Sequence, residues 1–306
     1  MIEFRCFRND DPPRLAEAWK AADLGPGALE PMTAALLETS VFSKPYFERE
    51  GLVVAEEAGR VVGFAHAAFG PNADQTAIDT SSGSTLLVVV VPQTDQAAVG
   101  AGLLERCERY LAGRGATTIY GGGSAAMRSF YLGLYGGADL PGILDSSPGM
   151  QEVFRRAGYV EADRIGVLRR PLAGFRPPVN RLHLAIRRST TLHVIDEPHR
   201  RTWWEAATTT GIALKRYELR GTDEHLLGTA SFWDMQPLSS AWGVTAAGLL
   251  HVGIEGPKRR QGFANYLVAE SLHDLAVEGV TLAEAQVSLA NEPALSLFTK
   301  LGFESV

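Results

Sequence analysis

The chain has 306 residues, more than the roughly 100 to 200 of a typical domain, and its 45% hydrophobic content is ample for buried cores. A formal charge of −6 gives no global attraction to DNA, RNA or anionic lipid, so any anion-binding site must be local. The N-terminus carries charges where a signal peptide needs an apolar core, and Cys6 and Cys107 lack zinc or redox spacing. These features predict a cytoplasmic protein of two domains, without a metal and without a nucleic-acid or membrane partner.

Strand and helix patterns alternate in the first half of the chain. Residues 84–92 are rich in valine and leucine, which is typical of a strand buried on both faces. Residues 93–115 carry a helical apolar stripe that ends at Gly-Arg-Gly. A strand at 117–123, a short helix within 146–160 and a last strand within 161–172 are expected to follow. This order indicates an α/β fold.

A linker is predicted by the glycine and paired prolines of LAGFRPPVN. We therefore expect an N-terminal domain at 1–172, a linker at 173–180 and a C-terminal domain at 181–306. The second domain is expected to open with RLHLAIRRSTTLHVIDEP, then a helix within 200–211 and two hairpin-like strands at 214–221 and 225–235.

The same order of strand and helix recurs near the C-terminus, in strands at 246–254 and 280–289 and helices at 259–279 and 291–303. Aligning Gly100 with Gly262 gives an offset of 162, and aligning Phe154 with Phe298 gives 144. The difference of 18 places an insertion within residues 121–145 of the first copy. Two divergent copies of one fold are the simplest explanation.

The second copy ends just after Gly302 and Phe303, where the first copy continues into another strand. That strand is expected to be missing or to come from elsewhere. A sheet edge left open in this way needs covering, and a homodimer is one way to cover it.

In the stretch KRRQGFA, residues 258–264, Arg259 to Gly262 are expected to form the first turn of a helix that follows a strand. Unpaired N–H groups and the helix dipole make such a start an anion site. Gly262 and Ala264 keep side chains away from the backbone, and Arg259 and Arg260 add charged donors. A pyrophosphate would fit there. The alternative is a capped helix behind a solvated cationic loop.

Two motifs resemble those of the GNAT superfamily of acetyl-CoA-dependent N-acyltransferases. RRQGFA resembles its R/Q-x-x-G-x-G/A signature, and NEPALSLFTKLGF resembles its N-x-x-A-x-x-L-Y-x-K-x-G-F motif. The resemblance implies an α/β fold of two GNAT-like domains, each a mixed, mostly antiparallel twisted sheet flanked by helices, with a splayed pair of central strands. The first copy has Ala97 where Arg or Gln is expected, so it is predicted to be degenerate.

Family resemblance also implies where acetyl-CoA would bind and what it would do. Its pantetheine would pair with the backbone around Val252 and Ile254 in the gap between the splayed strands, and Asn291 would bond it or cap the following helix. An acetyl group would pass by direct attack to a primary amine of a small molecule or peptide. The expected cofactor-binding residues also include Arg259, Arg260, Gln261, Gly262, Phe263, Ala264 and Phe298.

Proton transfer is the step for which the motifs give no standard residue. An alkyl amine has a pKa near 10 and must lose a proton to react. The tyrosine often proposed as general acid is Phe298 here, and the carboxylate found in some relatives is Gln286. Glu255, His251 and Glu284 are the candidate substitutes, of which Glu255 is preferred. The alternatives are solvated glutamates, a packed histidine and deprotonation through water.

Other residues leave further alternatives open. Trp203, Trp204 and Trp233 would line an acceptor pocket or pack in a core, and SFYLGLYGG of the insertion would form a lid or cover the sheet. A protein that binds acyl-CoA or a metabolite without turnover, and a scaffold for an oligomer, are the two alternatives to an enzyme.

Overall fold

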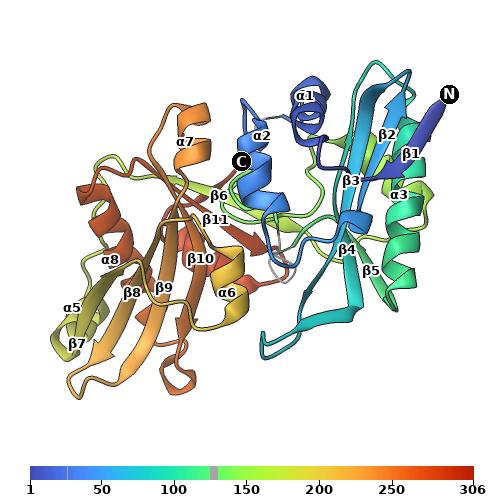
Figure 1. Ribbon diagram of the computed structural model, residues 1–306. Helices are drawn as coiled ribbons and strands as arrows, with labels where there is room; N and C mark the ends of the chain where they lie inside the picture. The colour runs from blue at the N-terminus through green and yellow to red at the C-terminus, as the bar shows by residue number, and fades with distance from the viewer. Residues whose placement is uncertain (26, 125–129) are drawn as a thin grey trace. The chain divides into compact units, whose positions relative to one another are not determined.

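The computed structural model describes residues 1–25, 27–124 and 130–306, which form two compact units. The first unit comprises Met1–Gly136, Leu140–Ala162 and Arg200–Thr210. The second unit comprises Gly137–Asp139, Asp163–His199 and Gly211–Val306. Each unit has its own β-sheet (Figure 1). Within the described ranges, no helix combines the length and the apolar character needed to cross a membrane.

The first unit contains a five-stranded sheet in the order β1-β2-β3-β4-β5. Its first four strands pair antiparallel and β5 pairs parallel to β4. The strands are β1 Ile2–Cys6, β2 Leu52–Glu57, β3 Arg60–Pro71, β4 Ile78–Val90 and β5 Thr118–Gly121. The helices are α1 Pro12–Ala22, α2 Ala34–Leu37, α3 Gln96–Gly113, α4 Pro148–Arg156 and α6 Trp203–Thr208, with short helical turns at Glu38–Phe42 and Arg49–Gly51.

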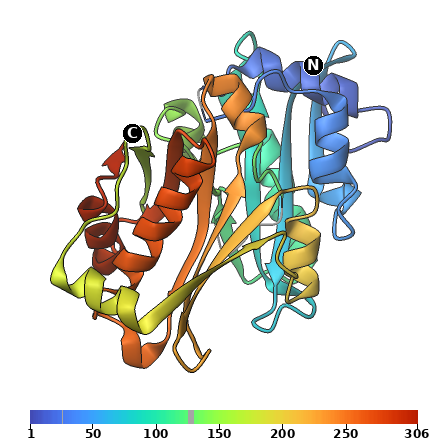
Figure 2. The same ribbon diagram turned by 90° about the vertical axis from the view of Figure 1, so that its left-hand side faces the viewer.

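The second unit contains a seven-stranded sheet in the order β12-β6-β11-β10-β9-β8-β7. Only β10 and β11 pair in parallel among the described strands of this sheet. Helix α8 lies along these strands with α9 beside it (Figure 2). The strands are β6 Ile165–Pro171, β7 Thr190–Asp196, β8 Leu214–Gly221, β9 Leu226–Asp234, β10 Ala246–Ile254, β11 Leu282–Ser288 and β12 Glu304–Ser305. The helices are α5 Arg181–Ser189, α7 Gln236–Trp242, α8 Phe263–Val277 and α9 Glu292–Lys300, with a turn at Gly256–Lys258.

These two sheets confirm the predicted α/β fold class. The helices and strands expected from clear apolar patterns are also present. The apolar run at 84–92 lies largely in β4, and the helical stripe of 93–115 is α3. The strand predicted at 246–254 is β10, with the expected bounds. Buried aliphatic faces were therefore enough to locate the central strands and their helices.

Strand β6 lies in a different sheet from the one expected. We predicted it as the last strand of the first domain, but Ile165–Pro171 pairs antiparallel with β11 and also borders β12. Thus β6 fills the place of the strand expected after Phe303, and the compact units divide near Asp163 rather than after Leu172. A strand pattern predicts a strand but not its partner, because any open sheet edge can accept it. A homodimer is not needed to cover this edge and stays a prediction.

Helix α6 also differs from its expected place, because it belongs to the first unit. The ring of Trp204 lies 4.6 Å from that of Tyr46. Lys44 Nζ donates to the carbonyl of Ala207 at 2.9 Å, and a cation is favourable at this C-terminal end of a helix. Trp204 therefore packs in the first unit, whereas Trp203 is 46% exposed. Neither shares a compact unit with Trp233.

His66 of β3 is fully buried in an aromatic cluster of the first unit. Its Nδ1 lies 3.1 Å from Tyr131 Oη, and its ring centroid lies 4.6 Å from that of Phe130. Phe130 and Tyr131 are each 2% exposed, so this part of the insertion covers the sheet, whereas residues 125–129 lie outside the described ranges. Burial lowers the pKa of His66 to about 3, which keeps the imidazole neutral.

We expect replacement of His66 by glutamine to flatten the dependence of stability on pH. The pKa of His66 in the folded chain is about 3, below the roughly 6.5 of an unfolded histidine, so its contribution is full above pH 6.5 and is lost as pH falls. Between about pH 6.5 and pH 4.5 the wild type should lose about 1.4 kcal/mol per pH unit more than His66→Gln. Urea denaturation across this range measures both slopes, and equal slopes would contradict a buried neutral His66.

Candidate active site

A gap opens in the second sheet where β10 and β11 diverge. Their parallel pairing runs from Ala246 and Leu282 to Leu249 and Ala285 and then ends. A bulge follows between Leu249 and His251, after which β10 continues along β9 while β11 continues along β6. Residues 250–254 and 286–288 therefore border a gap that no β-ladder bridges, which confirms the predicted splayed pair of central strands.

The helix start beside this gap has no side-chain cap. Gly262 is the N-cap residue of α8, with a φ of +84°. Across the described ranges, no acceptor faces the N–H groups of Gly262, Phe263 and Ala264, and the first backbone bond of the helix is from Tyr266 N–H to Gly262 O. Free N–H groups at the positive end of a helix are the donors that an anion needs.

The loop from 255 to 262 is cationic, and two of its side chains bond to nearby backbone carbonyls. Arg259 Nε donates to Ile254 O at 3.0 Å, and Gln261 Nε2 donates to Pro257 O at 2.7 Å. Lys258 Nζ lies 5.7 Å from the ring of Phe263, which is buried. In the part of the chain that the structure describes, Lys258, Arg259 and Arg260 form no ion pair. Their charge is thus free to attract a phosphate.

The corresponding loop of the first unit has the opposite character. Only residues 91–95 separate β4 from α3, and the N-cap Asp95 accepts from Ala98 N–H at 3.1 Å. Gly100 lies inside α3, where an added Cβ would stand 2.9 Å from Val153 Cγ2, so it is not the structural equivalent of Gly262. A carboxylate already caps this helix, and the degeneracy of the first copy stays a prediction.

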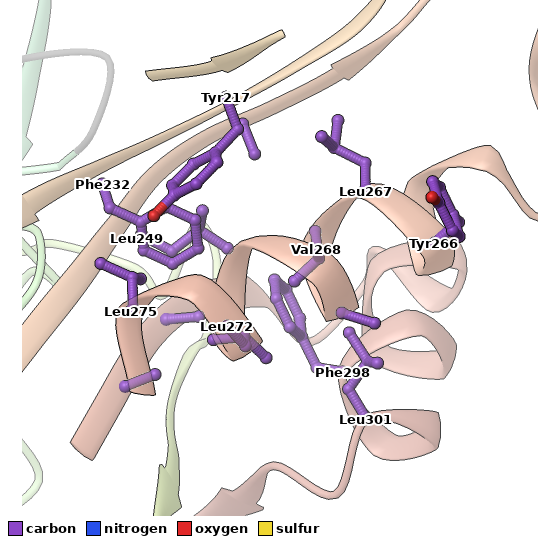
Figure 3. Packing of buried hydrophobic residues seen from close by; sticks show 14 of the residues in the cluster. Tyr217, Phe232, Leu249, Tyr266, Leu267, Val268, Leu272, Leu275, Phe298 and Leu301 are labelled. Atoms are coloured by element: carbon purple, nitrogen blue, oxygen red, sulfur yellow. The ribbon is translucent and has the colours of Figure 1, made fainter. Parts of the chain in front are cut away.

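Helix α8 holds its start in place through a large apolar face. Leu267, Val268 and Leu272 are fully buried in the core of the second unit. Figure 3 shows this face of α8 between the strands that carry Tyr217 and Phe232 and the helix that carries Phe298.

Phe298 stands where the resembled GNAT motif has a tyrosine, and it is a core residue. It is 5% exposed, and its ring centroid lies 5.2 Å from that of Phe303. A phenyl ring donates no proton. Its predicted contact with the cofactor stays a prediction.

Asn291 caps α9, as one of its two expected roles required. Its Oδ1 accepts from Ala294 N–H at 3.2 Å. In the first unit, Ser147 has the corresponding position as the N-cap residue of α4. The bond from Asn291 to pantetheine stays a prediction.

Glu255 and His251 lie at the open end of β10. Glu255 Oε1 is 3.1 Å from His225 Nε2, and both side chains are partly exposed. His251 is exposed, with its Nε2 2.7 Å from where a Cβ on Gly253 would stand. Val252 and Ile254 place their side chains against the core, so their backbone borders the gap. His225 is a functional candidate that sequence spacing did not identify.

Glu284 is engaged in a buried network rather than exposed to the gap. Its carboxylate is fully buried, where Oε2 accepts from Arg169 Nε at 2.7 Å and Oε1 accepts from Ala138 N–H at 2.7 Å. A buried carboxylate needs such charged and polar donors to offset its lost hydration. Its role as a base stays a prediction, and these contacts favour a structural role.

The segment Gly137–Asp139 is held on the second sheet by side chains of β9 and β11. Trp233 Nε1 donates to Ala138 O at 2.9 Å, and Gln286 Nε2 donates to Asp139 O at 2.9 Å. Gly137 has a φ of +93°, and a Cβ on it would stand 2.0 Å from an oxygen of Glu284. The polar face predicted for β11 thus binds backbone from the insertion, a contact that no spacing in the sequence indicated.

Comparison with known proteins agrees with this geometry. Residues 244–306 match the family model described as FR47-like protein. A GCN5-related N-acetyltransferase from Sphaerobacter thermophilus superposes with a TM-score of 0.66 at 16% identity, covering 100% of this chain and 92% of that one. A tandem GNAT protein from the clavulanic acid biosynthesis pathway gives 0.60 at 16%, covering 100% and 95%. The chain has the tandem GNAT fold.

A third similar structure is much longer than this chain, which covers only part of it. The glucosamine N-acetyltransferase region of a fungal multi-domain GH3 β-N-acetylglucosaminidase superposes with a TM-score of 0.72 at 17% identity, covering 100% of this chain but 37% of that protein. No curated protein matches the chain significantly in sequence.

Substitution of Glu284 by alanine should destabilise the second unit strongly. It leaves the Arg169 guanidinium and the Ala138 N–H without their acceptor, and breaking such a pair costs about 3 kcal/mol. Glu284→Gln, whose amide oxygen still accepts one of these donors, should lose less. Denaturant unfolding gives both values, with the exposed Glu304→Ala as control. Wild-type stability in Glu284→Ala would disprove the network's importance.

Gly262→Ala should destabilise the start of α8 and weaken binding of acetyl-CoA. An alanine at a φ of +84° is strained by about 1 kcal/mol, and its Cβ would stand 2.5 Å from Leu182 Cδ2. Gly256→Ala is the matched control, because a Cβ there meets nothing within 4 Å. Thermal unfolding and calorimetric titration should separate the two variants, and identical behaviour would count against the assigned helix start.

Proposed function

We propose that the protein is an N-acyltransferase that moves an acetyl group from acetyl-CoA to a primary amine of a small molecule or peptide. The observation that carries this proposal is the uncapped start of α8 at Gly262, bordered by three unpaired cations and placed at the gap between β10 and β11. The tandem GNAT fold supports the same reaction class.

In this proposal the gap receives the extended part of acetyl-CoA. Pantetheine amides would bond the backbone of β10 near Val252 and Ile254, which has no β11 partner beyond Leu249. The diphosphate would accept from the N–H groups of Gly262 to Ala264, with Arg259 and Arg260 neutralising its charge. The thioester would then lie near the bulge of β10.

The chemical step needs one proton removed and one supplied. The amine nitrogen attacks the thioester carbonyl, the new C–N bond forms, and the C–S bond breaks to release a thiolate. His251, next to the bulge, is the group of β10 that would lie nearest the thioester and can accept the amine proton. Glu255, paired with His225, lies four residues further along the chain, about 13 Å at the rise of a strand, so it would act through water. The thiolate takes its proton from one of these groups or from water, since Phe298 has none to give.

A binding protein without turnover is the second candidate function. Phe298 lies in the core, and the amide of Gln286 is bonded to Asp139 O. The two positions that carry proton chemistry in other family members therefore carry none here. Such a protein would bind acyl-CoA at the same helix start.

The double substitution Arg259→Ala with Arg260→Ala tests the shared binding site. Losing these charged donors should weaken binding of acetyl-CoA in isothermal titration by about 10- to 100-fold. Arg188→Ala, an exposed cation on α5, should leave affinity unchanged. Equal affinity in the double variant contradicts the site. Release of free thiol over a panel of amines then distinguishes the enzyme from the binding protein.

A further inference from the structure

A hollow of about 610 Å³ lies between α5 and α8 in the second unit. It is lined by residues 174–179, which follow β6, and by side chains of the two helices. Among the described residues that line it, none belongs to β10, β11 or the loop at 255–262, so the hollow is separate from the gap in the sheet. Its volume is typical of sites that enclose a small molecule.

His183 of α5 brings an acceptor without a partner to this hollow. It is 5% exposed, and its Nε2 lies 2.8 Å from Asn265 Oδ1. A carbonyl oxygen only accepts, so Nε2 carries the proton of the neutral ring and Nδ1 keeps a lone pair. That Nδ1 is buried and bonds to no described residue. Because an unsatisfied buried acceptor costs stability, a ligand in the hollow that donates to it would be stabilised.

Two further acceptors of the hollow come from α8. His273 also has a buried Nδ1 that bonds to no described residue. Glu270 lies three residues earlier, about one helical turn, and makes no hydrogen bond or ion pair within the described ranges. Two ring nitrogens and a carboxylate are suited to a group with several donors. An ammonium group, which donates from three N–H bonds and accepts none, is such a group.

Guanidinium groups line the same hollow. Arg176 and Arg187 are exposed, and neither makes an ion pair within the described ranges. Burial raises the pKa of Tyr266, Glu270 raises it further, and Arg187 opposes both, so charges of opposite sign act on one hydroxyl. Glu270 and Arg187 nevertheless do not pair with each other. A ligand that carries both signs of charge would give each of them a partner.

The remaining lining of the hollow is mostly apolar. Phe175 is 8% exposed, and the ring of Tyr266 is packed edge-on against that of His183. Pro177, Pro178, Val179 and Leu184 complete this part of the lining. Aromatic and aliphatic surface of this kind favours an apolar side chain over the hydroxyl groups of a sugar.

We propose that this hollow binds a free α-amino acid with an apolar side chain, at a site separate from that of acyl-CoA. The carboxylate of the amino acid pairs with Arg176 and Arg187. Its ammonium group donates to Glu270 and to the unpartnered Nδ1 atoms of His183 and His273. Its side chain lies against the aromatic and proline rings. This inference does not depend on the proposed function, because none of these groups takes part in acyl transfer.

Isothermal titration of the full chain with L-leucine, L-phenylalanine and L-tryptophan tests the site. At least one of them should bind at millimolar concentration or below. For the amino acid that binds most tightly, the analogue without its ammonium group and the analogue without its carboxylate should each bind about tenfold more weakly, because each loses a charge-assisted contact. Binding should persist when the protein is saturated with acetyl-CoA.

Substitutions assign each charge of the ligand to its partner. Glu270→Gln should weaken the amino acid about tenfold and leave the analogue without an ammonium group unaffected. Arg176→Gln with Arg187→Gln should weaken the amino acid and leave the analogue without a carboxylate unaffected. His183→Phe, which keeps an aromatic ring but removes Nδ1, should weaken the amino acid several-fold. Arg188→Gln is the matched control, since it removes a charge from α5 outside the hollow, and thermal unfolding verifies that each variant is folded.

The outcomes separate this inference from the proposed function. If acetyl-CoA displaces the amino acid, the hollow belongs to the cofactor site and the inference is overturned. No binding of any of the three amino acids to the folded wild type, or affinity that survives the substitutions of Glu270 and of the two arginines, overturns it as well. An equal loss in Arg188→Gln would assign the effect to general charge and has the same consequence. If acetyl-CoA does not bind, the proposed function fails, while the amino-acid titration still decides this inference.

Discussion

The buried carboxylate of Glu284 fixes the parts of the second unit on which the candidate site depends. It has no exposed surface, and two donors from distant parts of the chain, Arg169 and Ala138, bond its oxygens. Because an unpaired buried carboxylate is costly, β6 must lie beside β11 and the segment Gly137–Asp139 must lie against it. With its outer edge paired to β6, β11 can diverge from β10 without leaving its own backbone unpaired. The gap follows from that arrangement.

The two units show how one helix start can gain or lose affinity for an anion. In the first unit a five-residue loop ends in Asp95, whose carboxylate accepts from the N–H of Ala98 at the start of the helix. In the second unit the loop at 255–262 is longer and cationic, and it ends in Gly262, which has no side chain to cap the helix. Loop length, capping and charge all change together. Of these two helix starts, only that of α8 therefore keeps its N–H groups free for an anion.

The sequence correctly predicted those helices and strands that depend on residues close together in the chain. Apolar periodicity located β4, β10, α3 and α8. The start of α8 was predicted too early, because Arg259 to Gly262 were expected in its first turn, whereas the helix begins at Phe263 and these residues form the loop before it. The sequence did not predict the sheet that contains β6, the unit that contains α6 or the segment Gly137–Asp139 on β11, because these depend on pairing between residues far apart in the chain. The alignment of Gly100 with Gly262 failed for a related reason. A glycine motif looks the same whether it begins a helix or packs inside one.

Proton chemistry in this site has to be arranged around β10. The side chains of β11 that face the insertion are bonded to its backbone, and Phe298 of α9 is enclosed in the core. Among the described residues on or beside β10, those that can take up a proton near neutral pH are His251 and the pair of Glu255 with His225. An imidazole that a carboxylate orients is a common general base. If the protein turns over, its base and acid belong to this strand end, and the usual positions on β11 and α9 serve the fold.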